Sequence, residues 1–312
     1  MLNKEYKLIA IDIDGTLITS RYSISPRTLR ALREAMRAGI KVTIATGRFY
    51  MSSLRLAKKL PINAPLICND GAQIVDVHSG DSIFYRPLQM DIARKVLDIC
   101  ADYSSLRVQI FMEDHKVYVG RNFQLGQVIW YLKMKHHLRG FVNYLKDFVF
   151  VPVNNAGDFE KAKFAMKGLP AKIVICGEPG EMRQLKKRLA TLFGDNIFIT
   201  TAIKNCVDIL DGSVSKAKGL RVLAERYGFK RDEIIAIGDN INDLPMLEYA
   251  GLGVAMGNAP KPVKERADVV TAGNNEDGIA ILLEKVLGGM IRPKGNKHLI
   301  KPGMPKDIKV DQ

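Results

Sequence analysis

Short apolar runs that alternate with helical segments place the strongest constraint on how this chain folds. Residues 8–11 (L-I-A-I) and 41–45 (K-V-T-I-A) predict buried strands. Ser25-Pro26 between them predicts a helix start, because serine caps a helix and proline suits its first position. A second helical pattern ends at Pro61, and residues 65–68 predict a third strand. Strands spaced in this way are typical of βαβ units, so we expect an α/β fold on a Rossmann-like parallel sheet.

The middle of the chain follows a different pattern. The segment His78-Ser79-Gly80-Asp81 predicts a hairpin turn between two short strands. Further on, helices are predicted at residues 91–103, 158–167 and 179–193, and strands at residues 107–111, 117–119 and 172–176. This mixture is typical of an α+β domain inserted into an α/β frame.

After residue 196 the alternation of strands and helices returns. Ser215 predicts the start of a helix that runs to residue 227, and further elements are predicted at residues 233–237, 252–255, 268–270 and 276–287. We therefore expect a discontinuous core domain, an inserted cap domain and a basic C-terminal surface extension, at residues 1–84 plus 196–287, 85–195 and 288–312 respectively.

The charge of the chain bears on its partners. The 312 residues carry a formal net charge of +14, which admits two interpretations. One is a face that follows nucleic-acid phosphates, and the other is a general attraction for small anions. Basic residues are interspersed with acidic ones, aromatic residues make up only 7%, and no nucleic-acid-binding motif occurs, so we expect no nucleic-acid partner.

The four cysteines lie far apart in the sequence and form no C-x-x-C pair. That spacing favours reduced thiols over a disulfide framework or a zinc site. The N-terminus has no signal-peptide pattern, and no apolar run of about 18 residues predicts a membrane span. We expect a cytoplasmic protein without a membrane partner, and nothing in the sequence indicates its oligomeric state.

Polar residues gather where predicted strands end or a helix begins. They are Asp12-Ile13-Asp14-Gly15-Thr16, Thr46-Gly47-Arg48, Ser215-Lys216 and Gly238-Asp239-Asn240-Ile241-Asn242-Asp243. Ligands of open parallel sheets bind beyond the carboxyl ends of the strands, so we expect these segments to share one site.

The two aspartates after the first strand predict metal and phosphate chemistry. Asp12 and Asp14 are two residues apart, so on an extended segment both carboxylates point to the same side. Like charges that close need a cation between them, and Asp239 can reach the same place. Three carboxylates are hard oxygen ligands, which predicts a Mg²⁺ site. An aspartate can also attack phosphorus, while its neighbour exchanges protons with the leaving group and with water.

The remaining polar residues suit a phosphate group, because they offer a hydroxyl, an accessible N–H, an amide and a charge at a helix N-terminus: Thr46, Gly47, Asn242 and Lys216. Two alternatives fit less well. D-x-D-G also begins calcium loops, but Leu17 and Ser23 stand where the EF-hand pattern requires glycine and glutamate. Gly251-Leu252-Gly253 lacks the third glycine of a dinucleotide loop.

With these motifs in this order, the chain resembles the haloacid dehalogenase (HAD) superfamily, and within it the Cof-type phosphatases of subfamily IIB, which carry a C2-type α/β cap. Over residues 6–287, D-I-D-G-T-L, A-T-G-R, V-S-K-A-K-G-L and G-D-N-I-N-D resemble the four family motifs, and residues 250–271 resemble the segment after the fourth. The resemblance implies a Mg²⁺-dependent phosphomonoesterase that works through an aspartyl-phosphate.

The resemblance also implies a role for each matching residue. Asp12 is then the nucleophile and a metal ligand, and Asp14 is the general acid/base, with its backbone carbonyl on the metal. Asp239 is the third metal-binding carboxylate, and Asp243 contacts metal-bound water or orients the motif lysine. The phosphoryl group is held by Thr46, Gly47, Lys216 and Asn242.

Two positions depart from the family pattern. Ala217 follows the lysine of the third motif where glycine is usual, and Asp70 stands in I-C-N-D-G-A where asparagine is usual. We interpret Asp70 as a turn cap rather than as a residue that alters substrate entry.

The implied substrate is a small phosphorylated metabolite, a sugar phosphate or a related compound. The alternatives are a phosphomutase or phosphotransferase on the same fold, and a catalytically silent basic binding module, against which the complete catalytic set argues. Aspartate at position 14, where P-type ATPases have threonine, favours hydrolysis. Candidates for substrate selection in the cap are His115, Trp130 and residues 133–137, although packing suits Trp130 better and a solvated helix face suits the run better.

Overall fold

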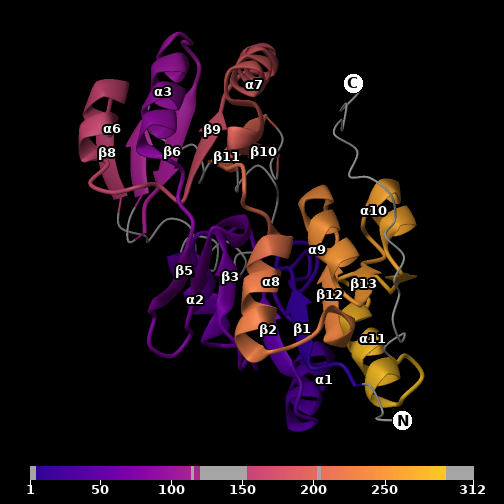
Figure 1. The fold of residues 1–312 in the computed structure, drawn as a ribbon. Coiled ribbons are helices and arrows are strands. Elements are labelled where there is room, and N and C mark those ends of the chain that lie inside the picture. The colour runs from indigo at the N-terminus through magenta and orange to yellow at the C-terminus, as the bar shows by residue number, and fades with distance from the viewer. Residues whose placement is uncertain (1–4, 114–115, 120–152, 202–204, 293–312) are drawn as a thin grey trace.

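The computed structural model describes residues 5–113, 116–119, 153–201 and 205–292, which form three sheets (Figure 1). The five-stranded sheet has the order β14-β13-β12-β1-β2, and every neighbouring pair in it is parallel. The prediction of an α/β fold on a parallel sheet is therefore confirmed. The strands are β1 (Leu8–Ile11), β2 (Lys41–Ile44), β12 (Ile234–Gly238), β13 (Leu252–Ala255) and β14 (Val269–Val270).

Helices cover both faces of the parallel sheet because its strands are apolar on both sides. In β1, Ile9 and Ile11 pack in one hydrophobic cluster with α1 and α11, whereas Leu8 and Ala10 pack in another with α8 and α9. Ser25 caps α1 as predicted. The helices around this sheet are α1 (Pro26–Arg37), α2 (Tyr50–Ala57), α8 (Lys216–Tyr227), α9 (Leu244–Tyr249), α10 (Lys261–Arg266) and α11 (Gly278–Leu287).

A three-stranded antiparallel sheet has the order β3-β4-β5. The hairpin predicted at residues 78–81 connects β4 and β5 and is confirmed. The third predicted strand, β3, is not part of the parallel sheet but touches it through one parallel bridge between Ala45 and Ile67. The strands are β3 (Leu66–Cys68), β4 (Gln73–Val75) and β5 (Ser82–Tyr85).

The middle of the chain forms a six-stranded sheet of order β10-β11-β9-β6-β7-β8, in which only the β7–β8 pair is parallel. Figure 1 shows this sheet and its helices stacked above the parallel sheet. We call it, together with those helices, the cap region. Its elements are α3 (Met90–Ala101), β6 (Arg107–Phe111), β7 (Lys116–Val119), β8 (Val153–Gly157), α6 (Phe159–Ala165), β9 (Lys172–Cys176), α7 (Pro179–Phe193), β10 (Ile197–Thr200) and β11 (Cys206–Asp211).

The boundary predicted between residues 195 and 196 is wrong, because β10 and β11 lie in the cap sheet. β11 pairs antiparallel with β9 on one side and with β10 on the other, so the chain leaves the cap sheet only after Asp211. Pairing between strands distant in sequence leaves no mark on local periodicity. The sequence alone therefore does not show that the chain returns to the core domain only after β11.

Two of the four cysteines are joined, contrary to the expectation of reduced thiols. Cys176 of β9 and Cys206 of β11 are directly opposite each other in the antiparallel pair and form a disulfide. Thirty residues separate them in sequence, so spacing alone carried no signal of the contact. Cys68 and Cys100 are free and buried.

The two chain segments that connect the parallel sheet with the cap region are joined by hydrogen bonds. Arg86, just after β5, donates from Nε to Asp211 Oδ1 at 3.3 Å and to Ser213 Oγ at 3.1 Å. Next to this contact, the Leu88 N–H donates to the Pro170 carbonyl at 2.8 Å. The incoming and outgoing segments therefore meet at one place.

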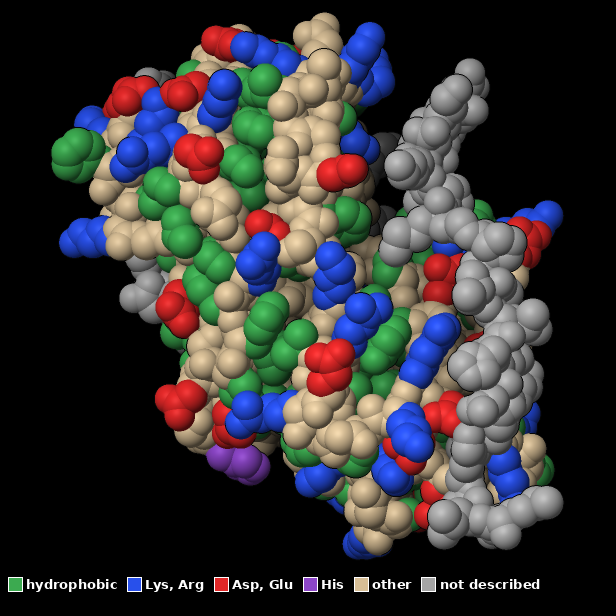
Figure 2. All heavy atoms as spheres, viewed as in Figure 1, with side chains coloured by type: hydrophobic (Ala, Val, Ile, Leu, Met, Phe, Trp, Pro, Cys, Tyr) green, Lys and Arg blue, Asp and Glu red, His purple; other side chains and the backbone are tan. Residues whose placement is uncertain are grey.

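The face of the molecule shown in Figure 2 carries both positive and negative charge, because Lys and Arg side chains are interspersed with Asp and Glu. That face therefore offers no continuous basic stripe. Among the described helices, none has the length and apolar character that a bilayer span needs.

Candidate functional site

Three carboxylates from separate segments converge at the carboxyl ends of neighbouring parallel strands. Asp12 follows β1, Asp239 follows β12, and Asp243 ends the short 3-10 turn Ile241–Asp243. One oxygen of each lies within 4.8 Å of the others. The register that pairs β1 with β12 produces this cluster, because it brings the ends of the two strands side by side.

Lys216 connects two of these carboxylates at the start of α8. Its Nζ lies 2.7 Å from Asp12 Oδ1 and 2.5 Å from Asp243 Oδ1, and all three side chains are buried. Burial alone would lower the pKa of Lys216, but the charges of Asp12 and Asp243 outweigh burial and raise it. The lysine therefore stays charged. Burial raises the pKa of Asp12, and Lys216 opposes that rise.

Asp14 does not share this contact, although the sequence predicted that it faces the same side as Asp12. β1 ends at Ile11, and the next residues form a turn in which the Leu17 N–H donates to the Ile13 carbonyl at 3.0 Å. The two-residue period of a strand consequently no longer applies. The Asp14 carboxylate, 54% exposed, accepts from Arg48 Nε at 2.7 Å and from Nη2 at 2.5 Å.

The Asp239 carboxylate accepts hydrogen bonds from Thr16, in the loop after β1, and from Asn258. Thr16 Oγ1 donates to Asp239 Oδ1 at 2.9 Å, and Asn258 Nδ2 lies 3.3 Å from Oδ2. Gly15 has φ +83°, and a Cβ there would lie 2.3 Å from Asp239 Oδ2, so a side chain at this position would strain the backbone and displace the Asp239 carboxylate. Burial raises the pKa of Asp239 to about 6.

The residues predicted to hold phosphate lie on one loop and beside it. The Thr46 hydroxyl accepts the Arg48 N–H at 3.1 Å, and the Thr46 carbonyl accepts the Asp70 N–H at 3.0 Å. Asn242 Nδ2 donates to Asp70 Oδ1 at 3.1 Å. A Cβ on Gly47 would lie 2.9 Å from both Asp70 carboxylate oxygens, so this backbone approaches the acid closely.

The contacts of Asp70 and Arg48 differ from what the sequence predicts. Asp70 has a left-handed backbone, with φ +54°, but its side chain is buried between Gly47 and Asn242 rather than serving as a surface turn cap. Arg48 belongs to the strand-end segment Thr46-Gly47-Arg48 and carries the charge that pairs with Asp14. The pair itself depends on where β1 ends, which the sequence did not show.

Asp12, Asp239 and Asp243, which we call the carboxylate cluster, form a candidate metal site. Asp12, Asp239 and Asp243 present hard oxygen donors, which fit a small divalent cation. The structure places the Asp243 side chain in this group, whereas the Asp14 side chain turns toward Arg48. The three proposed selectors, His115, Trp130 and residues 133–137, lie outside the described residues.

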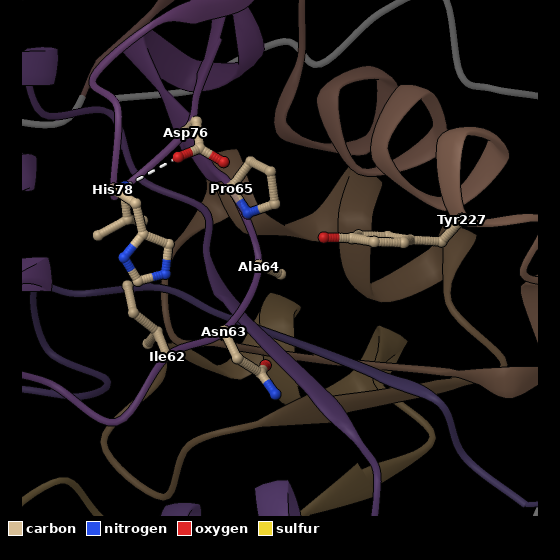
Figure 3. Close-up of a pocket in the computed structure, with 8 residues that line it drawn as sticks. Ile62, Asn63, Ala64, Pro65, Asp76, His78 and Tyr227 are labelled. Carbon is tan, nitrogen blue, oxygen red and sulfur yellow. Dashed lines mark hydrogen bonds between the residues drawn. The ribbon is translucent and has the colours of Figure 1, made fainter.

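A small recess lies apart from these residues (Figure 3). Its volume is about 40 Å³, which is room for little more than a few water molecules. Asp76 Oδ1 accepts the His78 N–H at its rim at 2.8 Å, and Tyr227 faces it from the opposite side (Figure 3). No residue of the carboxylate cluster lines it, so we assign it no ligand. The lining residues are Ile62, Asn63, Ala64, Pro65, Asp76, Val77, His78 and Tyr227.

Gly71 fixes the approach of the Asp70 loop to the start of α8. It has φ +99°, and a Cβ would lie 2.2 Å from the Ser215 carbonyl oxygen. We expect Gly71→Ala to lower the free energy of unfolding by about 2–4 kcal/mol, from backbone strain plus a backbone clash.

Urea unfolding measures this loss, and Gly39→Ala is the matched control. Gly39 has φ +87°, but nothing lies within 4 Å of a Cβ there, so its replacement reports strain alone. Equal losses in the two variants would show that the contact with Ser215 contributes nothing.

Known proteins resemble this chain over most of its length. A family model described as haloacid dehalogenase-like hydrolase matches residues 9–283. A 5-amino-6-(5-phospho-D-ribitylamino)uracil phosphatase of Bacillus subtilis is 30% identical over 88% of this chain and 94% of its own length. A pyridoxal phosphate phosphatase of Escherichia coli is 28% identical over 88% and 96%.

A solved structure of a haloacid dehalogenase-like hydrolase from Bacteroides thetaiotaomicron is also similar. It superposes with a TM-score of 0.75 at 28% identity, over 90% of this chain and 100% of that one. The match includes both the parallel sheet and the cap region, since it extends over nearly the whole chain. The chain therefore belongs to the haloacid dehalogenase-like hydrolase family, as a phosphatase of its Cof-type branch.

Proposed function

We propose that this protein is a Mg²⁺-dependent phosphomonoesterase that hydrolyses a small phosphorylated metabolite through an aspartyl-phosphate on Asp12. The observation that carries the proposal is the buried contact of Lys216 with Asp12 and Asp243, beside Asp239. A charged lysine next to a buried carboxylate opposes the rise in that carboxylate's pKa and favours the approach of an anionic phosphate.

In the first step an Asp12 carboxylate oxygen attacks phosphorus. The new O–P bond forms as the bond from phosphorus to the leaving alcohol oxygen breaks, and protonated Asp14 gives its proton to that oxygen. Thr46, Gly47, Asn242 and Lys216 hold the phosphoryl oxygens through hydroxyl, N–H, amide and ammonium groups.

In the second step water attacks the phosphorus of the aspartyl-phosphate. Asp14, now ionised, takes the proton from that water, and phosphate leaves as the Asp12 carboxylate is restored. The exposure of Asp14 supports hydrolysis over transfer to a sugar hydroxyl, because water reaches it directly. Arg48 fixes the position of the Asp14 carboxylate through two hydrogen bonds.

Asp12, Asp239 and the Asp14 carbonyl would hold Mg²⁺, with Asp243 beside them. The cation, when bound, neutralises charge on the phosphoryl oxygens. Since the curated relatives above carry phosphatase names with different substrates, we propose only the class for this chain, a sugar phosphate or a related small phosphate monoester.

The direct test measures phosphate release from a panel of phosphorylated metabolites and from p-nitrophenyl phosphate. We expect removal of divalent cations by EDTA to reduce release to background and added Mg²⁺ to restore it, because three clustered carboxylates need a counter-cation. Unchanged turnover in EDTA would refute the metal dependence. Absence of release from every substrate in Mg²⁺ would refute the proposed function.

A further inference from the structure

The cap sheet has one apolar face and one face with buried polar groups. Ile173 and Ile175 of β9 pack with the cap helices, so the alternate residues of β9, beginning with Lys172, face the other way. Lys116, Phe111 and Lys172 are directly opposite one another on β7, β6 and β9. They therefore form a row on this polar face.

Lys172 reaches out of the cap region to the loop at residues 46–48, which we call the phosphate loop. Its Nζ lies 2.6 Å from the Gly47 carbonyl oxygen and 2.8 Å from Asp208 Oδ2 on β11. The same ammonium group lies 3.6 Å from Asp70 Oδ2, and the three charged side chains are at most 8% exposed. Lys172 thus joins Asp208 of the cap region to Asp70 and to the Gly47 carbonyl, which lie outside it.

The charge on this lysine is stabilised by its neighbours. Burial alone would lower the pKa of Lys172, but the carboxylates of Asp208 and Asp70 outweigh burial and raise it. Removal of the lysine would leave two buried carboxylates with no cation between them. A buried charge that loses its partner is strongly destabilised, so such a change would disturb the loop that carries Asp70.

Two of the groups that Lys172 contacts, the Gly47 carbonyl and Asp70, are linked to predicted phosphate ligands. The Gly47 carbonyl belongs to the same peptide unit as the Arg48 N–H, which donates to Thr46 Oγ1. Asp70 accepts from Asn242 and donates its own N–H to the Thr46 carbonyl. Lys172 therefore contacts Gly47 directly and is one contact away from Thr46 and Asn242.

We propose that Lys172 is a positioning residue, which holds the Gly47 carbonyl and neutralises Asp70 so that Thr46, Gly47 and Asn242 are set to receive a phosphoryl group. This inference rests on the proposed function, and it makes the seating of the cap region a condition for assembly of the phosphate site. It also accounts for the unusual aspartate at position 70, since the cap supplies the countercharge.

A double-mutant cycle tests the inference with p-nitrophenyl phosphate as substrate and inorganic phosphate as inhibitor. We expect Lys172→Met to lower kcat/KM about tenfold or more and to weaken phosphate inhibition by a similar factor. Asp70→Asn alone should change either value by less than about threefold. In the double variant, loss of the Asp70 charge should recover part of the loss in both values, while the part that comes from the missing contacts with Gly47 and Asp208 remains.

Lys116→Met is the matched control, because Lys116 is buried in the same row, and its Nζ lies 4.7 Å from the Phe111 ring centroid and 5.5 Å from the Phe49 ring centroid. Its effect should add to that of Asp70→Asn without coupling. Additivity for Lys172→Met, or phosphate inhibition within about threefold of wild type, would overturn the proposal.

Hydrogen exchange at the Arg48 amide separates this inference from the proposed function. That N–H donates to Thr46 Oγ1, and we expect Lys172→Met to speed its exchange about tenfold while amides of β1 keep their rates. Unchanged exchange would overturn the positioning role. Faster exchange in a protein that releases no phosphate from any substrate would leave that role standing and refute the phosphatase reaction.

Discussion

Asp12→Asn is expected to abolish phosphate release while the protein stays folded. Asparagine has nearly the same shape, and Lys216 keeps its second partner, Asp243, in the variant. The amide cannot form the acyl-phosphate, so turnover on p-nitrophenyl phosphate should fall by about a thousandfold or more. Colorimetric phosphate release measures the loss, and circular dichroism with thermal unfolding checks the fold.

Asp98→Asn, on the exposed side of α3, is the control for the same chemical change. It should retain full turnover. An Asp12→Asn variant with more than about a tenth of wild-type activity would rule out Asp12 as the nucleophile. If Asp12→Asn is inactive and also unfolded, Asp12→Glu takes its place. Glutamate keeps a negative charge beside Lys216 but moves the attacking oxygen.

Lys116→Met is expected to stabilise the protein, and the gain should shrink as the pH rises. Burial, with the nearby charge of Lys172, lowers the pKa of Lys116 to about 7. Below that pH the native state buries a charged lysine. Between about 7 and 10.5 the unfolded chain binds a proton that the native protein does not, so wild-type stability rises across this window. The methionine variant should gain up to about 4 kcal/mol at pH 6.5 and much less at pH 10.

Urea unfolding of both proteins at the two pH values measures this difference. Lys218→Met, at an exposed position of α8, is the control and should show no gain that depends on pH. A loss of stability at pH 6.5, or a gain that grows toward pH 10, would contradict the burial of an unfavourable charge at position 116.

Local signals in the sequence predicted the elements that depend on local chemistry. The strand at residues 172–176 and the helix at residues 179–193 have the predicted bounds, since β-branched runs, Pro179 and a helical period are all visible along the chain. Ser215 caps α8 as predicted, by accepting the Lys218 N–H. The alternation of these elements was enough for the fold class.

Contacts made across the fold could not be predicted in the same way. The Cys176–Cys206 disulfide depends on the register of two antiparallel strands, and the Asp14–Arg48 pair depends on where β1 ends. Lys172 carries no motif at all, because its proximity to Gly47 arises only when the cap region sits on the parallel sheet. These features follow from tertiary packing rather than from propensity.

The contact of Arg86 with Asp211 and Ser213 gives the cap region one pivot instead of two independent tethers. Motion of the cap region would then be a rotation about that pivot, as in a hinged lid. Pro170, whose carbonyl accepts the Leu88 N–H beside the pivot, is two residues before Lys172, so the lysine follows closely along the chain from the pivot. A swing that lifts the Lys172 ammonium group from Gly47 and Asp70 would therefore release the phosphate site as the cap region opens.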